Sequence, residues 1–366
     1  MEYKRLGEYI EPVDERNSKL EIKLSQGICN EKYFQDPRQV AENSAADKIV
    51  RHGYFAYNRA TTRNGEKISI AYREGPDCTV SSAYQVFRIK DEEKLNPKYL
   101  LMWYKRSDFD RYARFRSHGS AHEFFEYDEM CDVYLPMPSI ERQREIVEEY
   151  ETLSRRIRLN NQMIQHLEAT AQAHYRKTFV DNIDKENLPE GWRMGTLGEV
   201  ATCLDYKRKP LSEDERKPIK GMYPYYGAMS VVDHINQYIF DGTYLLFSED
   251  GANVIDEKGH PALQYLWGKF WVNNHAHVLQ GNEVVSTEYL YIALKDVNAV
   301  HLVTGAAQPK INQENMNSIQ LVIPSKEDME EFNKIIQHIF HLYKQKTEEN
   351  WILTELQSLL LAKMGQ

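Results

Sequence analysis

The stretch that decides the fold is Leu135-Pro-Met-Pro-Ser-Ile-Glu-Arg-Gln-Arg-Glu-Ile146, where a proline-rich segment leads into a long charged one. Ser139 is a natural helix N-cap, because its hydroxyl accepts hydrogen bonds from the unpaired N–H groups of a first turn. The acids Glu141 and Glu145 follow, and negative side chains stabilise the positive end of a helix. The stretch therefore predicts that a long helix begins at Ser139.

Apolar residues then recur at alternating spacings of three and four, which is the seam of a coiled coil. Asn160 is the one seam position that is not apolar. A second such segment follows Ser325, and its seam breaks at Lys346 and Asn350. The two apolar seams consist of Ile146, Tyr150, Leu153, Ile157, Ile164, Leu167 and Ala171, and of Phe332, Ile336, Ile339, Tyr343, Leu353, Leu356 and Leu360.

A helix of about forty residues would be roughly 60 Å long, and its apolar stripe needs a partner. Two equivalent helices in one chain supply each other. Because a globular segment lies between them, antiparallel pairing is the simplest geometry, with the two globular parts at opposite ends. The alternative is that each helix packs only on its own domain.

The chain also repeats itself, because several short motifs recur in the same order 186 to 192 residues later. Such a drift is expected when loops differ in length while the framework keeps its register. The chain is therefore predicted to be α+β, with two copies of a mixed α/β part followed by a long helix. The matching motifs are Leu6-Gly-Glu-Tyr-Ile10 and Leu197-Gly-Glu-Val-Ala201, Asn96–Leu101 and Ser286–Tyr291, Gly119–His122 and Gly305–Gln308, and Leu135–Ser139 and Leu321–Ser325.

Short apolar and aromatic runs predict the strands of the two mixed parts. We expect short helices at Lys98–Lys105 and Glu288–Lys295, and a linker at Asp181–Trp192, where Pro189-Glu-Gly191 breaks the helical pattern. The strand-like runs are Gly53–Tyr57, Ile68–Tyr72, Tyr84–Ile89, Tyr244–Phe247 and His277–Leu279.

Composition is that of a soluble globular protein of about two to three domains: 366 residues, 42% hydrophobic and 28% charged. The N-terminal residues contain no apolar core of a signal peptide, and no stretch approaches a membrane span. The four cysteines lie far apart, without the spacing of a zinc site. These features predict a reduced, cytoplasmic protein with neither a metal nor a cofactor.

The net charge of −9 is unusual for a nucleic-acid binder, but the charges are not evenly spread. Basic residues predominate in Arg51–Arg73 and Lys98–Arg116, whereas His122–Glu151 contains ten acids and only two arginines. Basic segments of this kind could form a separate face. Ordinary solvated charge remains the alternative.

No catalytic motif is complete. Asn96-Pro-Lys-Tyr99 lacks the second proline of a methyltransferase tetrapeptide, and Asp256-Glu-Lys258 is a fragment of a nuclease pattern. There is no P-loop, which excludes an ATP-driven motor. His275-Ala-His277 has no evident third metal ligand, so a structural or DNA-facing role is favoured. We therefore expect no catalytic residues.

Polar and basic loops that contain glycine occur at comparable places in both halves of the chain. Arginine suits bidentate contacts with guanine, and asparagine or glutamine with adenine, so these residue types suit direct readout of DNA. For any single loop, a solvated turn is the alternative. The predicted DNA-binding residues are Arg59, Thr62, Arg63, Asn64, His118, Ser120, Lys207, Arg208, Lys209, Ser248, Asn253, Gln308, Lys310 and Asn312.

The whole layout resembles the specificity subunit of type I restriction-modification enzymes, the HsdS family. The Pro-x-Pro-Ser-x-x-x-Gln-x-x-Ile tract of residues 136–146 and the tract Thr304-Gly-Ala-Ala-Gln-Pro-Lys-Ile311 are similar to that family's motifs. Ser325-Lys-Glu-Asp-Met-Glu330 departs from it, because the usual Glu-Gln pair is missing. The resemblance implies target recognition domains at 1–138 and 183–324, and spacer helices at 139–182 and 325–366.

The resemblance also implies a function. Each recognition domain would read one half of an asymmetric, split site in double-stranded DNA, and the helices would set the spacing between the halves. Two adenine methyltransferase subunits and a restriction and translocase subunit would be the partners. The alternatives are a stand-alone adenine methyltransferase, a coiled-coil scaffold that binds protein, and the recognition subunit of a Type IIB-like enzyme.

Overall fold

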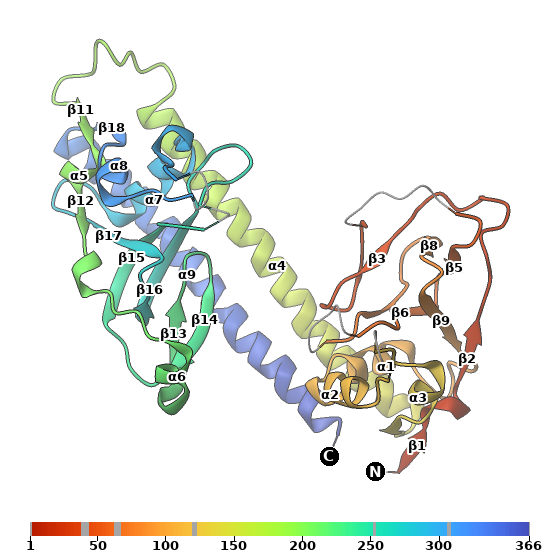
Figure 1. Ribbon diagram of the computed structural model, residues 1–366. Coiled ribbons are helices and arrows are strands. Elements are labelled where there is room, and N and C mark those ends of the chain that lie inside the picture. The colour runs from red at the N-terminus through yellow and green to blue at the C-terminus, as the bar shows by residue number, and fades with distance from the viewer. Residues whose placement is uncertain are drawn as a thin grey trace. The chain divides into compact units, whose positions relative to one another are not determined.

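A computed structural model describes residues 2–37, 44–61, 67–118, 123–251, 254–305 and 309–365. The chain forms two compact units, whose ribbons are shown in Figure 1. The first unit contains Met1–Asn160 and Glu349–Gln366, and the second contains Asn161–Glu348. Two long helices, α4 (Ile140–Phe179) and α9 (Lys326–Lys363), therefore each contribute one part to each unit.

A four-stranded antiparallel sheet, in the order β2-β9-β6-β7, forms the centre of the first unit. Side chains alternate between its faces, as the two-residue period of a strand requires. Phe55 and Tyr57 enter a hydrophobic cluster that includes residues of α1, whereas Ala56 enters the cluster on the other face. The elements are β1 (Tyr3–Arg5), β2 (Ile10–Val13), β3 (Gly27–Ile28), β4 (Phe34–Gln35), β5 (Lys48–Val50), β6 (Phe55–Asn58), β7 (Ile70–Tyr72), β8 (Cys78–Val80), β9 (Tyr84–Ile89), α1 (Pro97–Tyr104), α2 (Ser107–Phe115), α3 (Tyr127–Cys131) and β10 (Tyr134–Pro136).

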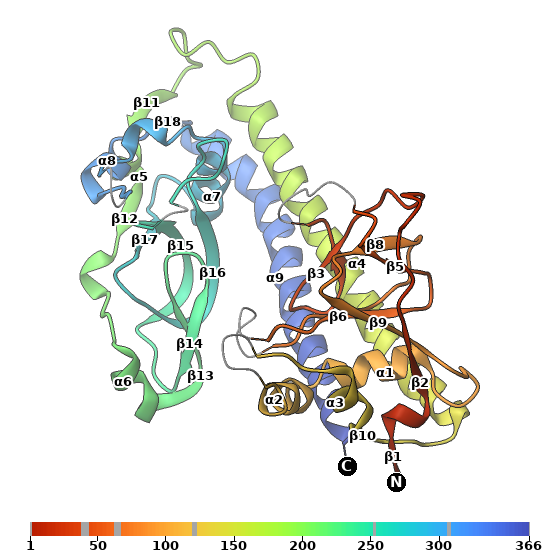
Figure 2. The ribbon, with the colours of Figure 1, turned by 45° about the vertical axis from the view of Figure 1, so that its right-hand side comes forward.

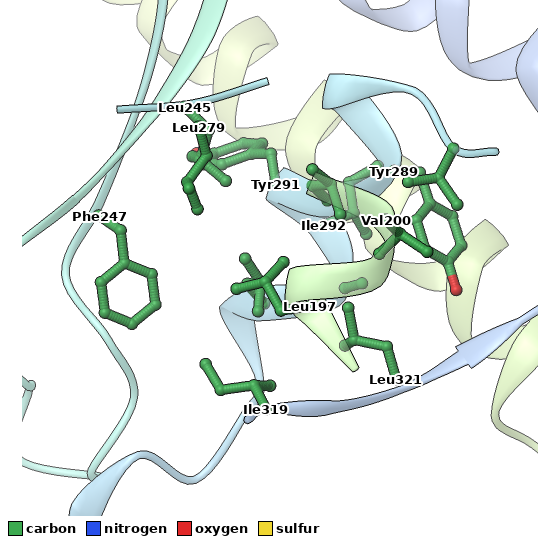
Figure 3. Close-up of a cluster of buried hydrophobic side chains, with 14 of the residues drawn as sticks. Leu197, Val200, Leu245, Phe247, Leu279, Tyr289, Tyr291, Ile292, Ile319 and Leu321 are labelled. Carbon is green, nitrogen blue, oxygen red and sulfur yellow. The ribbon is translucent and has the colours of Figure 1, made fainter. Parts of the chain in front are cut away.

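A six-stranded sheet, in the order β12-β17-β15-β16-β13-β14, forms the centre of the second unit. Leu245 and Phe247 enter the cluster shown in Figure 3, together with residues of α7, whereas Leu246 enters the cluster on the opposite face. The elements are β11 (Arg193–Thr196), α5 (Leu197–Val200), β12 (Ala201–Cys203), α6 (Glu213–Arg216), β13 (Lys220–Tyr226), β14 (Val231–Ile235), β15 (Phe240–Ser248), β16 (Leu263–Val272), β17 (Ala276–Gly281), α7 (Thr287–Lys295), α8 (Gln313–Asn317) and β18 (Gln320–Ile323).

The predicted internal repeat is confirmed by equivalent hydrogen bonds. Strand β1 pairs with β10 as β11 pairs with β18, antiparallel in both cases. The Leu6 N–H donates to the Val133 carbonyl at 2.8 Å, and the Leu197 N–H donates to the Ile319 carbonyl at 2.8 Å. The repeated tyrosines act alike too, because the hydroxyl of Tyr99 donates to a carbonyl of β10, and its counterpart in α7 donates to a carbonyl of β18.

The repeated Leu-Gly-Glu motif has a steric reason. A Cβ atom on Gly7 would lie 2.8 Å from Cβ of Cys131, and one on Gly198 would lie 3.1 Å from Cβ of Asn317. Both distances are shorter than ordinary carbon contacts. Glycine is therefore the residue that lets the backbone approach the neighbouring segment in each repeat.

Both long helices begin where the sequence predicts. The Ser139 hydroxyl accepts a hydrogen bond from the Arg142 N–H at 3.3 Å, and the Ser325 hydroxyl accepts one from the Asp328 N–H at 3.1 Å. Each serine thus accepts a hydrogen bond from one of the otherwise unpaired N–H groups in the first turn of its helix.

The helices pair antiparallel within the first unit (Figure 1 and Figure 2), where Gln357 Nε2 donates to the Ser154 hydroxyl at 2.7 Å. Further along α4 and further back along α9, Asn160 donates to the Asn350 side-chain oxygen at 3.0 Å. Residue numbers thus rise on one helix as they fall on the other. The predicted polar positions of the two seams meet each other at this point.

The same antiparallel sense holds in the second unit. Phe332 of α9 stacks on His174 with ring centres 5.1 Å apart, and lies 4.9 Å from the Phe179 ring. Ala171, one turn back along α4, and Ile336, one turn further along α9, are both buried in the same cluster. The predicted fold class, two mixed α/β regions with two long antiparallel helices, is confirmed.

One seam position was predicted wrongly. Leu356 is 43% exposed, and Gln357 takes its place against α4. The spacing of the seam explains why Leu356 was chosen wrongly. A step of three from Asn350 to Leu353 must be followed by a step of four, which leads to Gln357. The predicted short helices and the five predicted strands are confirmed to within four residues at their ends.

Candidate nucleic-acid interface

In the first repeat, the loop after β6 is held by a short hairpin. The Phe125 N–H donates to the Arg59 carbonyl at 2.9 Å, and the Thr61 N–H donates to the Glu123 carbonyl at 3.0 Å. Within the hairpin, His118 and Phe124 exchange two backbone hydrogen bonds of 3.1 and 2.9 Å. Two predicted DNA-binding loops, one at Arg59 and one at His118, are therefore brought side by side.

The second repeat builds the same framework after β15. The Ile311 N–H donates to the Glu249 carbonyl at 2.9 Å, and Thr304 and Lys310 exchange two backbone hydrogen bonds of 2.8 Å. Asp250 forms a bridge with Lys310, as Ala60 does with Phe124 in the first repeat. The chain thus has two equivalent groups of loops with different side chains. We call the loop after β6, with the hairpin of His118 and Phe124, the first platform. The second platform is the loop after β15, with the hairpin of Thr304 and Lys310 and the neighbouring loop that carries Lys207 and Lys209.

On the first platform, Arg59 already forms contacts with other residues of the protein. Arg59 Nε donates to the Ala83 carbonyl at 3.2 Å, its Nη1 lies 3.1 Å from Glu126, and its guanidinium lies 5.7 Å from the Phe124 ring. Its side chain is 35% exposed. His118 is open to solvent, with Nε2 3.8 Å from Glu129. Both side chains lie near the surface, where they could reach a ligand.

The second platform carries three exposed lysines. Lys207 lies 5.7 Å from the ring of Tyr206, which is itself strongly exposed. Lys209 is exposed at the end of the same loop. Lys310, on the hairpin, lies 2.7 Å from Glu249 and keeps 46% of its side chain exposed. An exposed aromatic ring among lysines suits stacking on bases and contacts with phosphates.

Three predicted residues of the second repeat point inward instead. Arg208 is largely buried and donates to the Ala276 carbonyl at 2.9 Å. Ser248 is 1% exposed. Asn312 caps α8 by accepting a hydrogen bond from the Asn315 N–H at 2.8 Å. These side chains support the loops from within, and their predicted contact with DNA remains a prediction.

The remaining predicted DNA-binding residues lie outside the described residues. They are Thr62, Arg63, Asn64, Ser120, Asn253 and Gln308.

A buried histidine beneath the second platform was noticed in the sequence only as part of a pair. His277 is 2% exposed, its Nδ1 lies 2.6 Å from Asp205, and its Nε2 lies 2.9 Å from the Ile311 carbonyl oxygen. His275 is exposed instead and lies 2.8 Å from Asp250. For His277, burial and these two contacts support the structural role, and the DNA-facing role of the pair stays a prediction.

An ion network surrounds this histidine. Arg208 lies 3.0 Å from Asp205 and 2.6 Å from Glu249, which also pairs with Lys310. Burial raises the pKa of both carboxyl groups, but hydrogen bonds and the nearby positive charges outweigh it, so both pKa values are lowered. Both groups are therefore carboxylates at neutral pH.

Cys203 lies close enough to Asp205 and His277 for the three side chains to hold a metal ion. The guanidinium of Arg208 already balances the carboxylate of this trio. Burial raises the pKa of the Cys203 thiol to about 11, so this thiol is protonated at neutral pH. The donor set therefore fits an ion-pair network better than a metal centre.

A family model described as the type I restriction modification DNA specificity domain matches residues 47–169 and 189–357, well over half of the chain. The chain belongs to this family. The two matched segments of the specificity-domain model fall one on each structural repeat, so the repeat and the family assignment agree.

Two Haemophilus influenzae proteins are similar to this specificity-family chain. A putative type I restriction enzyme specificity subunit is 31% identical over 160 residues, which are 44% of this chain and 40% of that protein. The HindI specificity subunit is 21% identical, and the match covers 87% of each chain. This chain thus matches less than half the length of the first relative and most of the second.

A crystal structure of the S subunit of a type I restriction-modification system from M. genitalium shares the fold. The match covers 100% of this chain and 96% of that one, with a TM-score of 0.59 and 14% sequence identity. Among the described residues, no helix is both long and apolar enough to cross a membrane.

Proposed function

We propose that this chain is the sequence-reading subunit of a type I restriction-modification enzyme and binds an asymmetric, split site in double-stranded DNA. The observation that carries the proposal is the pair of loop platforms, which share a hydrogen-bonded framework but differ in their side chains. Arg59 corresponds to Glu249, His118 to Thr304, and Phe124 to Lys310. Equivalent frameworks with unlike surfaces suit two different half-sites.

The proposed domain limits follow the repeat. Residues 1–138 and 183–324 would be the two target recognition domains, and residues 139–182 and 325–366 the two spacer helices. The helices observed at Ile140–Phe179 and Lys326–Lys363 support these limits.

The proposed chemistry is recognition without catalysis. Lysine and arginine side chains on the platforms would neutralise phosphates, and their polar neighbours would read base edges in the major groove. Methylation and cleavage would be the work of partner subunits in the cytoplasm: two adenine methyltransferase subunits and one restriction and translocase subunit.

An apolar groove in the first unit supports docking of a methyltransferase subunit. The groove has a volume of 1090 Å³ and lies between the first half of α4 and the end of α9. Leu153, Leu356, Leu359 and Leu360 line it, and Glu145 is among the charged residues beside them. Exposed apolar surface with a polar rim is typical of a protein interface.

The decisive experiment is co-expression with the adenine methyltransferase encoded beside this chain, followed by single-molecule sequencing of methylated adenines. We expect a split motif with two unlike halves. Replacing Lys207 and Lys209 together by alanine should lower methylation of that motif, because it weakens recognition of one half-site. Arg59→Ala should also lower methylation, because it weakens recognition of the other half-site. Lys19→Ala and Lys326→Ala are matched controls, because their side chains are 83% and 84% exposed.

Two results would contradict the proposal. Methylation that is unchanged when this chain is deleted would show that it does not direct the methyltransferase. Partner binding that is insensitive to salt and to nuclease treatment would favour a protein-binding scaffold instead.

A further inference from the structure

We propose that a backbone phosphate of the DNA binds to Lys105 in the first unit, in a cavity where the second unit has a carboxylate of its own. This inference rests on the proposed recognition of DNA. It adds a contact outside the predicted DNA-binding residues, and it concerns the first unit only.

The internal repeat makes Lys105 the counterpart of Lys295. Each lysine lies six residues after a tyrosine, Tyr99 or Tyr289, whose hydroxyl donates to a carbonyl of the equivalent strand. Lys105 directly follows α1, and Lys295 ends α7. The two lysines therefore lie at the same end of equivalent helices, and the groups around them can be compared.

In the second unit, this lysine has a carboxylate partner on a long helix. Nζ of Lys295 lies 3.1 Å from Glu168 of α4. The Tyr291 hydroxyl donates to the same carboxylate at 2.6 Å. The positive charge of Lys295 is therefore balanced within the protein.

In the first unit, the corresponding residue of the other long helix is a threonine. Glu168 lies 29 residues after Ser139, which caps α4, and Thr354 lies 29 residues after Ser325, which caps α9. Thr354 lines a cavity together with Lys105, so the two residues are also close in space. A small hydroxyl group therefore replaces the carboxylate that the repeat predicts beside this lysine.

No carboxylate of the described residues lies within ion-pair distance of Lys105. Its amino group lies 5.2 Å from the centre of the Tyr150 ring. The two acids that act on its charge, Glu74 and Glu151, pair with Lys98 at 2.9 and 3.2 Å. Burial lowers the pKa of Lys105, and these acids do not offset that effect. A bound anion would therefore stabilise the charged form of the lysine.

The cavity beside Lys105 has a volume of 290 Å³, and its lining includes three lysines and two acids. Lys32 lies 2.5 Å from Asp110, and Lys67 lies 3.0 Å from Glu31, so each of these two lysines is balanced. Lys105 is the third lysine and leaves one positive charge in excess. Such a cavity suits a singly charged oxyanion, such as a phosphodiester or a carboxylate.

The position of the cavity favours a phosphate of DNA. Lys67 and Ile68 lie in the loop after β6, which begins with Arg59 and belongs to the first platform. The amino group of Lys32 donates to the Ile68 carbonyl at 2.9 Å, so the cavity is built on this loop. On the side of α9, Thr354 is exposed, and the cavity is open to solvent there. A DNA strand on the first platform would bring phosphodiesters, each with one negative charge, to this opening.

The sharpest test restores the acid that the first unit lacks. In Thr354→Glu, the new carboxylate should pair with Lys105 as Glu168 pairs with Lys295, so that this lysine no longer binds a phosphate. Binding of the target duplex by the complex with its methyltransferase is measured at several salt concentrations. The slope of log K against log salt concentration should become shallower by about one unit, and the affinity should fall roughly threefold to tenfold. Lys105→Gln should have the same effect.

Two control variants separate the ion pair from other effects. Thr354→Gln has the size of the glutamate variant without its charge, so it should leave the slope unchanged. Ala362→Glu adds a negative charge at an exposed position further along α9, outside the lining of the cavity, and should change the slope by much less than one unit. The melting temperature of Thr354→Glu should be at least that of the wild type, because the new ion pair lies inside the cavity.

Three results would overturn the inference. The first is a slope that neither Thr354→Glu nor Lys105→Gln changes. If inorganic phosphate then raises the melting temperature of the wild type but not of Thr354→Glu, the cavity binds a free anion instead. The second is an equal loss of affinity in Thr354→Glu and Ala362→Glu, which would show a general effect of charge. The third is weaker binding of the methyltransferase to Thr354→Glu without DNA, which would assign the cavity to an acidic side chain of that partner. If the wild-type complex does not bind the duplex at all, the proposed function itself fails.

Discussion

At the scale of single residues, Gln143 shows how one buried amide can join the first mixed α/β region to a helix. It is 0% exposed at the start of α4. Its oxygen accepts from the Asn96 N–H at 2.8 Å, and its nitrogen donates to the carbonyls of Lys94 and Pro138 at 3.0 Å each. The second repeat has Met329 at the corresponding position, buried in the core. In the second helix, the glutamine of the expected Glu-Gln pair is thus replaced by a core methionine.

Replacing Gln143 by methionine should lower the free energy of unfolding by about 2 to 3 kcal/mol. The side chain keeps its size, so the loss comes from buried backbone groups left without partners. Denaturant unfolding of the chain would measure it, and Arg142→Met on the exposed side of the same turn should change stability by less than about 0.5 kcal/mol. Equal effects of the two substitutions would contradict the assigned role.

At the scale of elements, a buried pair of asparagines joins the long helices near the middle of their seams. Asn160 is 3% exposed and donates to Asn350 at 3.0 Å. A buried amide pair favours one register of two helices, because a slip would separate the two amides and place Asn350 against a leucine or isoleucine of α4. The pair therefore contributes specificity of pairing more than stability.

Asn160→Leu should cost about 1 to 3 kcal/mol, because it leaves the Asn350 amide facing an apolar side chain. The double replacement of Asn160 and Asn350 by leucine should be more stable than the single variant, since no amide is then left buried. A double-mutant cycle by thermal unfolding measures the coupling. Additive effects of the two substitutions would show that the pair does not couple the helices.

At the scale of the whole molecule, the net charge of −9 conceals a positive local surface. Lys207, Lys209 and Lys310 lie exposed on one platform, whereas acids such as Glu145 and Glu148 lie on α4 beside the apolar groove. The negative net charge therefore comes in part from the acidic surface beside the groove, which we assign to a protein partner. Such a division allows an acidic protein to bind DNA.

Binding of the target duplex should weaken steeply with salt in spite of the net charge. Each lysine that neutralises a phosphate contributes about one unit to the slope of log K against log salt concentration. Lys207→Ala and Lys209→Ala should each reduce this slope by about one unit, and Lys326→Ala should leave it unchanged. A slope that none of these substitutions changes would place the phosphate contacts elsewhere.

Local sequence patterns are sufficient to predict the helices, the strands and their repetition. Serine caps at Ser139 and Ser325, seams of alternating spacing, and the recurring Leu-Gly-Glu motif depend on local periodicity, capping and close approach, which nearby residues control. The sequence also indicated the loops that build the two platforms. These features are visible without a structure because each depends on a few neighbouring positions.

Which side chains face inward depends on the three-dimensional packing of the chain. Arg208 resembles a surface residue in a polar loop, yet its guanidinium donates to the carbonyl of Ala276, 68 residues away along the chain. Ser248 is likewise buried by the tertiary structure, whereas Asn312 caps α8 locally. His277 gains its place from Asp205 and Ile311, which lie 72 and 34 residues away along the chain. Burial and charge pairing depend on such long-range neighbours. For that reason, no local pattern could separate the residues that support the platforms from those exposed on them.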